Sequence, residues 1–395
     1  MNAVSLNGWA RIVATIALAA AVASCSSAET RHSETLVSAF PSPKEDFLVH
    51  RAEVREYLLD TQMGQRTATD AEFNVPYELE ANEGVPYRGK FMLIHGLNDS
   101  PYLWQDMARE LATRGYDVRA ILLPGHGSTP RAQLAVSHTN WLNAAREHMA
   151  LYREPDKKLF LGGFSLGGVI ATLLAAESDQ VDGLLLFSPA YRSKIHNLLR
   201  WARLYSRVKP WAFGGMIIED NPVKYNSIPI NSGAQYFNAT KELKQLWPEK
   251  RLDVPALVVA SINDSVVDIE YMENSFKSGF VSDKYMIVYD NERAGQTVGN
   301  IEYRKGTDPE ARILNQSHQS VLISPNNPLY GTEGRILVCN GNEFPVFVRC
   351  LRYKGTHWYG AQNTPSPNGV PVARSTYNPD FDYVLTRFEK LFLNQ

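Results

Sequence analysis

Short apolar runs that stop at glycine, proline or polar residues alternate along the chain with segments of helical periodicity. An uninterrupted apolar run favours a buried strand, and apolar residues recurring three or four positions apart favour a helix. Their alternation predicts an α/β protein with a mostly parallel central sheet and helices on both faces. The runs that we interpret as strands are 90–94, 118–123, 158–161, 183–187, 254–261 and 285–289.

The helical segments follow the same alternation. The first, over 46–66, is amphipathic, and the last, over 379–394, is expected to close the fold. Between them, 104–111 and 140–152 also have helical spacing, and Gly115 is a C-terminal cap signal for the former. The residues expected on one side of the first helix are Phe47, Val54, Tyr57 and Leu58.

Two segments break the alternation and divide the chain. We predict a core of 46–189 and 251–395, a helical cap over 190–250 and a late insertion over 324–375. Neither segment has the composition of a disordered linker, because both contain aromatic residues. The cap aromatics either cover an acyl chain or pack the cap on the body. They are Tyr191, Trp201, Tyr205, Trp211, Phe213, Tyr225, Tyr236, Phe237 and Trp247.

Composition and charge exclude few functions. The 395 residues are 44% hydrophobic and 21% charged, as in an ordinary globular protein. A net charge of −2 does not indicate the excess of positive charge that binds nucleic acid, so no nucleic-acid partner is expected. No C-x-x-C or histidine-rich spacing suggests a metal site, and we expect neither a metal nor an organic cofactor.

The N-terminus has the features of an export signal. Arg11 precedes an apolar run over 12–23 that is too short to span a bilayer. We interpret 1–24 as a signal peptide and 25–45, rich in Ser and Pro, as a tether.

The small residues 22–24 before Cys25 resemble a bacterial lipoprotein processing box, in which lipid is attached to the cysteine thiol. Ser26 and Ser27 follow the cysteine, and neither is the Asp that retains lipoproteins at the inner membrane. The resemblance therefore predicts an exported protein, anchored in the cell envelope at the outer membrane and facing the periplasm or the surface. The alternative is an ordinary secretory signal with an incidental cysteine.

Two further cysteines, Cys339 and Cys350, lie in the late insertion. Export would place them in an oxidising compartment, where an even pair favours a disulfide. Two buried free thiols are the alternative. The stretch 344–348 between them is expected to form part of a hairpin.

Candidate chemistry centres on Gly163-Phe164-Ser165-Leu166-Gly167, which lies between a strand and a helix. G-x-S-x-G in this context predicts a nucleophile elbow, in which the glycines permit a sharp turn and expose the serine hydroxyl. The serine needs a histidine as its base and a carboxylate to hold that histidine.

In an elbow fold the acid and then the histidine follow the serine along the chain. His196, His318 and His357 follow Ser165. We favour His318, which follows a strand and a long loop, over His357 in the insertion. For the acid we favour Asp264, just past a predicted strand. Asp268 is more suited to capping the next helix.

These pieces resemble the α/β-hydrolase superfamily, in particular its esterase and monoacylglycerol-lipase-like branch, over about 90–325. His95-Gly96-Leu97 resembles the family's first-loop H-G-x, and 123–127 its P-G-H-G turn. The resemblance implies Ser165, Asp264 and His318 as a catalytic triad. It also implies the backbone N–H groups of Leu97 and Leu166 as the oxyanion hole. His95 and His126 are expected to hold loops rather than to react.

The expected function is a serine hydrolase acting on carboxylic esters, with a small-molecule ester or an acyl lipid as its substrate and a membrane reached through the lipid anchor. The chain departs from the family in its late insertion and in a long polar loop over 291–317, which leave the shape of the site mouth open. Two alternatives remain. One is a serine peptidase or amidase, for which Glu219 and Asp220 are candidate contacts to an amino terminus. The other is a non-catalytic lipoprotein scaffold.

Overall fold

The computed structural model describes residues 31–61, 67–212, 221–225, 227–247 and 250–393. Within these residues one sheet of nine strands forms the centre, in the order β1-β3-β2-β4-β5-β6-β7-β9-β8. Neighbouring strands are parallel except β1 with β3 and β8 with β9. The predicted fold class is therefore confirmed. The strands are β1 (Tyr77–Leu79), β2 (Gly89–Ile94), β3 (Tyr116–Ile121), β4 (Leu159–Phe164), β5 (Gly183–Phe187), β6 (Ala256–Ser261), β7 (Lys284–Tyr289), β8 (Thr297–Val298) and β9 (Ile301–Arg304).

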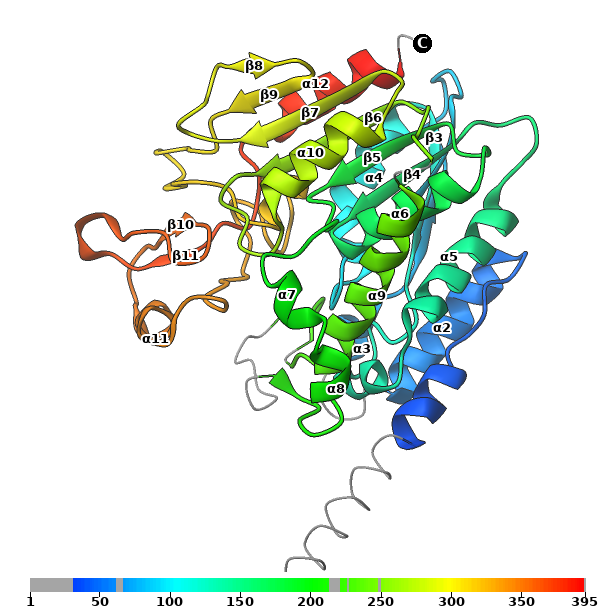
Figure 1. Ribbon diagram of the computed structural model, residues 1–395, viewed down its shortest axis with the longest axis horizontal. Coiled ribbons are helices and arrows are strands. Elements are labelled where there is room, and N and C mark those ends of the chain that lie inside the picture. The colour runs from blue at the N-terminus through cyan, green and yellow to red at the C-terminus, as the bar shows by residue number, and fades with distance from the viewer. Residues whose placement is uncertain (1–30, 62–66, 213–220, 226, 248–249, 394–395) are drawn as a thin grey trace, which may run out of the picture.

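Helices cover both faces of this sheet (Figure 1). Successive residues of β2 show why its sequence is continuously apolar. Met92 and Ile94 belong to the core shared with α5, α6, α9 and α10, whereas Phe91 and Leu93 belong to the core shared with α4 and α12. The helices are α2 (Phe47–Thr61), α3 (Ala68–Glu72), α4 (Gln105–Thr113), α5 (His138–Tyr152), α6 (Leu166–Glu177), α7 (His196–Leu199), α8 (Ala202–Tyr205), α9 (Ile230–Leu246), α10 (Ile269–Gly279), α11 (Phe344–Arg352) and α12 (Phe381–Phe392).

Polar side chains set where several of these helices begin. The hydroxyl of Ser137 accepts from the Asn140 N–H, and the Asn140 side chain accepts from the Ser137 N–H, which is a reciprocal cap on α5. Asp268 caps α10 by accepting from the Tyr271 N–H at 3.1 Å, which confirms its expected role.

The polar loop expected over 291–317 contains strands β8 and β9, which extend the sheet at one edge. In β9, buried Ile301 and Tyr303 alternate with partly exposed Glu302 and Arg304. This two-residue period was present in the sequence, but the segment is too short and too polar to stand out.

The N-terminal end of the described chain packs on the body. Residues 31–38, expected to lie in the tether, are helical, and Ser33 is buried. Its hydroxyl donates to the Arg131 carbonyl at 2.6 Å, and the Tyr57 hydroxyl donates to the Leu36 carbonyl at 3.0 Å. The predicted signal peptide and Cys25 lie outside the described residues, as does Phe213 of the cap. In the part of the chain that is described, no helix has the length and apolarity needed to cross a membrane.

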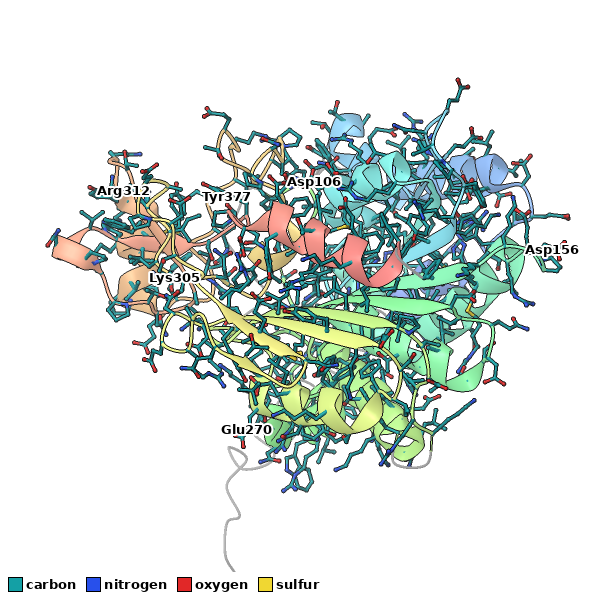
Figure 2. All side chains as sticks on the ribbon, turned by 90° about the horizontal axis from the view of Figure 1, so that it is seen from above. Asp106, Asp156, Glu270, Lys305, Arg312 and Tyr377 are labelled. Atoms are coloured by element: carbon teal, nitrogen blue, oxygen red, sulfur yellow. A yellow bond between two sulfur atoms is a disulfide. The ribbon has the colours of Figure 1, made fainter. Side chains whose placement is uncertain are left out.

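The late insertion forms a lobe at the carboxyl end of the strands. It contains α11 and a parallel pair of short strands, β10 (Trp358–Gly360) and β11 (Val372–Arg374). Figure 2 shows Arg312, beside this lobe, at the opposite end of the molecule from Asp156, which precedes β4. Cys339 and Cys350 are buried and joined by a disulfide.

The expectation of a hairpin over 344–348 is wrong, because these residues begin α11. Pro345 lies in the first turn of this helix, where its missing N–H costs no hydrogen bond. Of the residues that suggested a strand, Phe347 packs against the Cys339–Cys350 pair, whereas Phe344 is exposed to solvent.

Candidate active site

Ser165 lies at the turn between β4 and α6. Its backbone has φ 54° and ψ −114°, a conformation that a non-glycine residue adopts only under constraint. Its N–H donates to the Phe187 carbonyl of the neighbouring strand at 3.0 Å. A Cβ at Gly167 would overlap the Ile94 carbonyl oxygen, and one at Gly163 would lie 2.5 Å from the Gly167 carbonyl oxygen. Both glycines are required because the turn brings backbone against backbone.

A continuous series of hydrogen bonds joins the three residues expected to act together. His318 Nε2 is 2.9 Å from Ser165 Oγ, and His318 Nδ1 is 2.5 Å from Asp264 Oδ2. A carboxylate only accepts, so Nδ1 carries the proton of the neutral ring and Nε2 is left to accept from the serine hydroxyl. His318 is thus within hydrogen-bond reach of both Ser165 and Asp264, which is the arrangement that a nucleophile, its base and an orienting acid require.

Asp264 is fully buried but well satisfied. Its Oδ1 accepts from the N–H groups of Val266 at 2.7 Å and Val267 at 3.0 Å. Burial alone would raise the pKa of this carboxyl, but attraction to His318 and the three hydrogen bonds lower it below its usual value. Asp264 is therefore held as a carboxylate beside the imidazole.

The backbone of His318 is also held. The Ser188 hydroxyl, at the end of β5, donates to the His318 carbonyl at 3.1 Å. The Ser261 hydroxyl, at the end of β6, donates to the Gln316 carbonyl at 2.8 Å. The histidine loop is therefore fixed to the carboxyl ends of two central strands.

The competing candidates lie elsewhere. His357 Nε2 is 2.9 Å from the Cys350 carbonyl oxygen, inside the late lobe. The ring of His196, on α7, packs against Phe237. Asp268 is engaged as the cap of α10. The structure brings none of the three into the hydrogen-bonded series around Ser165.

The loop after β2 passes directly against the serine. A Cβ at Gly96 would lie 3.1 Å from Ser165 Cβ, so a larger residue there would press on Ser165. Leu97 follows, and it lines the same cavity as Ser165 and Leu166. Leu166 is the first residue of α6, so its N–H has no acceptor within the helix.

His95 and His126 support these loops, as expected. His95 Nδ1 is 2.8 Å from the Gly96 carbonyl oxygen, and His95 Nε2 accepts from the Leu123 N–H at 3.1 Å. This pattern requires neutral imidazole. Burial lowers the pKa of His95 well below its usual value and lowers that of His126 to about 4.

A cavity of about 440 Å³ opens over Ser165. Helix α7, the loop before α9 and α9 itself contribute apolar lining residues, whereas the histidine loop and the late lobe contribute polar ones. The apolar lining includes Leu97, Leu199, Ile228, Tyr236 and Val266, and the polar lining includes Gln319, Asn340, Arg374 and Thr376.

The aromatic residues of the cap divide between several roles. Tyr225 and Tyr236 line the cavity, and their hydroxyls donate to the carbonyls of Gly125 at 2.6 Å and Ala190 at 2.8 Å. Tyr225 thereby fastens the cap to the body, whereas Tyr236 bonds to the first residue of the cap. Trp201 and Tyr205 are instead exposed to solvent.

Sequence reasoning missed an ion pair in the cavity wall. Lys224 Nζ, in the cap, is 3.2 Å from the buried carboxylate of Asp99, in the loop after β2. Burial raises the pKa of Asp99, and Lys224 opposes that rise. No local pattern relates the two residues, which are 125 positions apart. Asp99 lies two residues after the H-G-L motif, and this position is the sequence feature that could have pointed to a role in the site.

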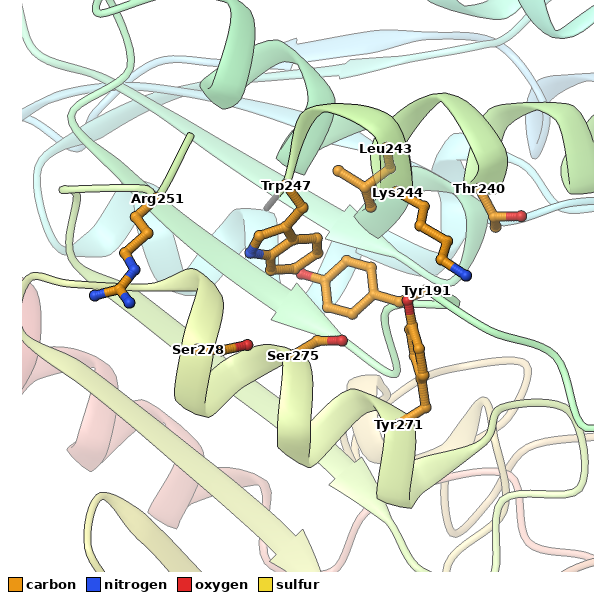
Figure 3. Close-up of a pocket in the computed structure, with 9 residues that line it drawn as sticks. All are labelled: Tyr191, Thr240, Leu243, Lys244, Trp247, Arg251, Tyr271, Ser275 and Ser278. Carbon is orange, nitrogen blue, oxygen red and sulfur yellow. The ribbon is translucent and has the colours of Figure 1, made fainter. Parts of the chain in front are cut away.

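A second cavity, of about 360 Å³, lies between α9 and α10 (Figure 3). The rings of Tyr191, Trp247 and Tyr271 form its wall, and none of its lining residues is shared with the cavity over Ser165. Across the described ranges, no cluster of three or more His, Cys, Asp or Glu side chains is arranged to hold a metal ion.

A parallel sheet with a strained serine between β4 and α6, followed in the chain by Asp264 and His318, is the architecture of an α/β-hydrolase. The chain belongs to the family described as serine aminopeptidase, S33 (Hydrolase_4), which matches residues 86–293, slightly more than half of its length.

The chain is also similar to individual relatives. It is 24% identical over 99 residues to the thermostable monoacylglycerol lipase of Bacillus sp. (strain H-257), a match covering 25% of this chain and 40% of the relative. It is 25% identical over 197 residues to protein ABHD8 of Homo sapiens, covering 45% of each. The chain thus spans less than half the length of these curated relatives.

Among solved structures, similarity extends to a soluble variant of monoglyceride lipase from Saccharomyces cerevisiae. The TM-score is 0.46 and the identity 16%, over 55% of this chain and 81% of that one. A metagenome-derived lipolytic enzyme from the study of LipS and LipT also has a TM-score of 0.46, with 23% identity, over 54% of this chain and 87% of that one.

Proposed function

We propose that the protein hydrolyses carboxylic esters through an acyl-enzyme on Ser165. The observation that carries the proposal is the series Ser165–His318–Asp264, joined by hydrogen bonds of 2.9 and 2.5 Å at the mouth of a cavity. A serine hydroxyl becomes an effective nucleophile only when a neighbouring base can take its proton, and this arrangement provides that base.

In the first half-reaction, Ser165 Oγ attacks the ester carbonyl carbon while His318 Nε2 takes the hydroxyl proton. The tetrahedral intermediate collapses, the bond to the alcohol oxygen breaks, and the imidazolium returns the proton to the leaving alcohol. In the second, His318 takes a proton from water, and the resulting attack releases the acid and restores Ser165. Asp264 keeps the proton on Nδ1 and stabilises the imidazolium.

We assign the oxyanion hole, which binds the negatively charged oxygen of the tetrahedral intermediate, to the backbone N–H groups of Leu97 and Leu166. Support comes from the approach of the Gly96 loop to Ser165 and from the position of Leu166 at the N-terminus of α6. Each donor of this kind contributes on the order of 3 kcal/mol to transition-state stabilisation.

The lining of the cavity supports a proposal for the substrate class. Apolar residues from the cap side, such as Leu199 and Ile228, suit an acyl chain, and the polar residues beside His318 suit an alcohol. We propose acyl esters such as monoacylglycerols or lysophospholipids. The similarity of a part of this chain to a relative named as a monoacylglycerol lipase supports this choice.

We also propose, from the features of the N-terminus, that Cys25 is lipidated and anchors the exported protein at the outer membrane. Its support is the apolar run over 12–23 and the small residues before Cys25. The mature protein should then partition into detergent, and Cys25→Ser should release soluble protein. An unmodified N-terminus at any other residue, found by mass spectrometry, would contradict the anchor.

Two measurements test the ester-hydrolase proposal. A fluorophosphonate probe should label the wild-type protein at Ser165 and should not label Ser165→Ala. The purified protein should then cleave esters in preference to amides and peptides in a common panel. An unlabelled wild-type protein would indicate a non-catalytic scaffold.

A serine aminopeptidase activity is the second candidate, because the family bears that description. Such an enzyme needs an anionic contact for the substrate ammonium group. The buried carboxylate Asp99 lines the cavity but is paired with Lys224. Glu219 and Asp220 lie outside the described residues. Faster cleavage of peptides than of esters in the panel would favour this candidate.

A further inference from the structure

The cap segment 194–209 turns an apolar face to solvent. We call the residues of this face the apolar stripe; they are Leu198, Trp201, Leu204, Tyr205 and Val208, each between 53% and 84% exposed. They recur three or four positions apart, and backbone hydrogen bonds such as Tyr205 N–H to Trp201 C=O give the segment helical turns. The buried residue of this segment is Ala202, whereas the five residues of the stripe are exposed. The stripe is therefore additional to the face that packs on the body.

Cations flank the stripe. Lys194, Arg200, Arg203, Arg207 and Lys209 are all exposed, and the sequence from 194 to 209 contains no Asp or Glu. The whole chain has a net charge of −2, so this excess of positive charge is local. Large exposed apolar side chains among charges of a single sign are typical of segments that lie in a membrane interface.

The same segment borders the entrance to the cavity over Ser165. Ile195 and Leu199 line that cavity, while Leu198, between them, belongs to the stripe. Figure 1 shows α8 at the lower edge of the molecule, with α7 above it and nearer the sheet. A surface that covered the stripe would therefore meet the rim of the cavity.

We propose that segment 194–209 docks the protein on a lipid surface that contains anionic lipids. The apolar stripe enters the headgroup boundary, and the flanking cations contact the lipid phosphates. A lipid surface is favoured over a protein partner because the charged residues of segment 194–209 are all positive, and an anionic bilayer is their general complement. Docking in this orientation lets an acyl chain pass from the bilayer to the cavity along Ile195 and Leu199.

The test uses the full-length chain carrying Cys25→Ser, so that no lipid anchor contributes to binding. Vesicles of phosphatidylcholine with about one third phosphatidylglycerol are compared with pure phosphatidylcholine vesicles by co-sedimentation. We expect at least tenfold tighter partitioning to the anionic vesicles, and a loss of that preference in high salt because exposed charges are screened. Equal or absent binding to the two vesicle types would overturn the proposal.

Two double variants separate the contribution of the apolar stripe to vesicle binding from the contribution of the flanking cations. Trp201→Ser with Leu204→Ser should weaken binding to anionic vesicles at least tenfold. Arg203→Gln with Arg207→Gln should bring it close to the level of neutral vesicles. The matched controls are Phe344→Ser and Arg352→Gln, at exposed positions on α11 in the late lobe, which should change binding less than twofold.

Thermal unfolding of each variant checks that it is folded, so that a loss of binding reports on the surface. Controls that weaken binding as much as the stripe variants would refute the assignment of this surface. A stripe variant that abolishes self-association in sedimentation velocity, with vesicle binding unchanged, would also refute it and would assign the stripe to a protein interface.

Discussion

Ser317 and Ser375 are 58 positions apart in the sequence and are joined by two hydrogen bonds. The Ser317 N–H donates to Ser375 Oγ at 2.8 Å, and Ser317 Oγ donates to the Ser375 carbonyl at 2.7 Å. Ser317 precedes His318, and Ser375 follows β11 of the late insertion. The Arg374 N–H in turn donates to the Val338 carbonyl at 2.7 Å, beside the disulfide cysteine Cys339. The insertion therefore holds the loop that carries the proposed catalytic base.

Removing the disulfide should destabilise this lobe. Replacement of both Cys339 and Cys350 by Ser is expected to lower the free energy of unfolding by about 2–3 kcal/mol, because the bond closes a short loop in the unfolded chain. Urea unfolding of the double variant and the wild-type protein measures the difference, with Cys25→Ser as the control. Two alkylatable thiols in the native exported protein would contradict the prediction.

The proposed nucleophile and base should each be essential for ester turnover. Ser165→Ala and His318→Ala are each expected to lower kcat by about four orders of magnitude or more, with substrate binding nearly retained. His357→Ala is the matched control, because it removes a histidine that contacts the Cys350 carbonyl in the late lobe. Steady-state kinetics on a chromogenic ester provides the comparison, and an inactive His357→Ala with an active His318→Ala would assign the base to His357.

The two neighbouring aspartates should behave differently. Asp264→Asn should lower kcat by about four orders of magnitude, because an amide can donate to His318 Nδ1 and stabilise the wrong tautomer. Asp268→Asn should retain activity and most of the stability of α10, since Asn is also a good N-terminal cap. Similar kinetic losses in both variants would show that Asp264 does not have the proposed role.

Acyl-chain length tests the apolar side of the cavity. If acyl chains lie against residues such as Leu199 and Ile228, kcat/KM for p-nitrophenyl esters should rise from acetate through medium chains. Each buried methylene is worth about 0.8 kcal/mol, or roughly a factor of four, until the cavity is full. A series in which acetate is the best substrate would mean that the cavity does not hold an acyl chain.

Acid should destabilise the fold through its buried histidines. Burial lowers the pKa values of His50, His95, His126 and His148, that of His126 to about 4. Between this value and the ordinary pKa of about 6.5, the unfolded chain binds more protons than the folded one. Stability should therefore fall as the pH decreases through this window, by up to about 1.4 kcal/mol per pH unit for each such histidine.

Urea unfolding between pH 7.5 and 4.5 measures this slope. His126→Gln should give a shallower slope than the wild-type protein, because it removes one group that titrates only on unfolding. Asp264 should not contribute here, since its lowered pKa preserves its stabilising effect until the pH falls below the ordinary carboxyl range. A stability that does not change between pH 6.5 and 4.5 would refute the prediction.

The sequence by itself predicted the elements whose signals are local. The apolar runs that became β2 to β7 were visible because strands buried on both faces have continuous hydrophobic sequences. Asp268 was identifiable as a cap because capping involves residues only three apart. The turn at Ser165 was predictable from its glycines, which are required by backbone contacts within the turn itself and with the neighbouring β2.

The tertiary structure decided whatever depends on segments distant in the chain. The Lys224–Asp99 pair and the presence of Asn340 and Arg374 in the cavity have no local pattern, because each arises from segments that meet only after folding. The same holds for α11, whose β-branched residues favour strands locally. The disulfide and the packing of Cys350 in the lobe accompany a helix instead. Local propensities differ by about 1 kcal/mol or less per residue, so long-range packing can override them.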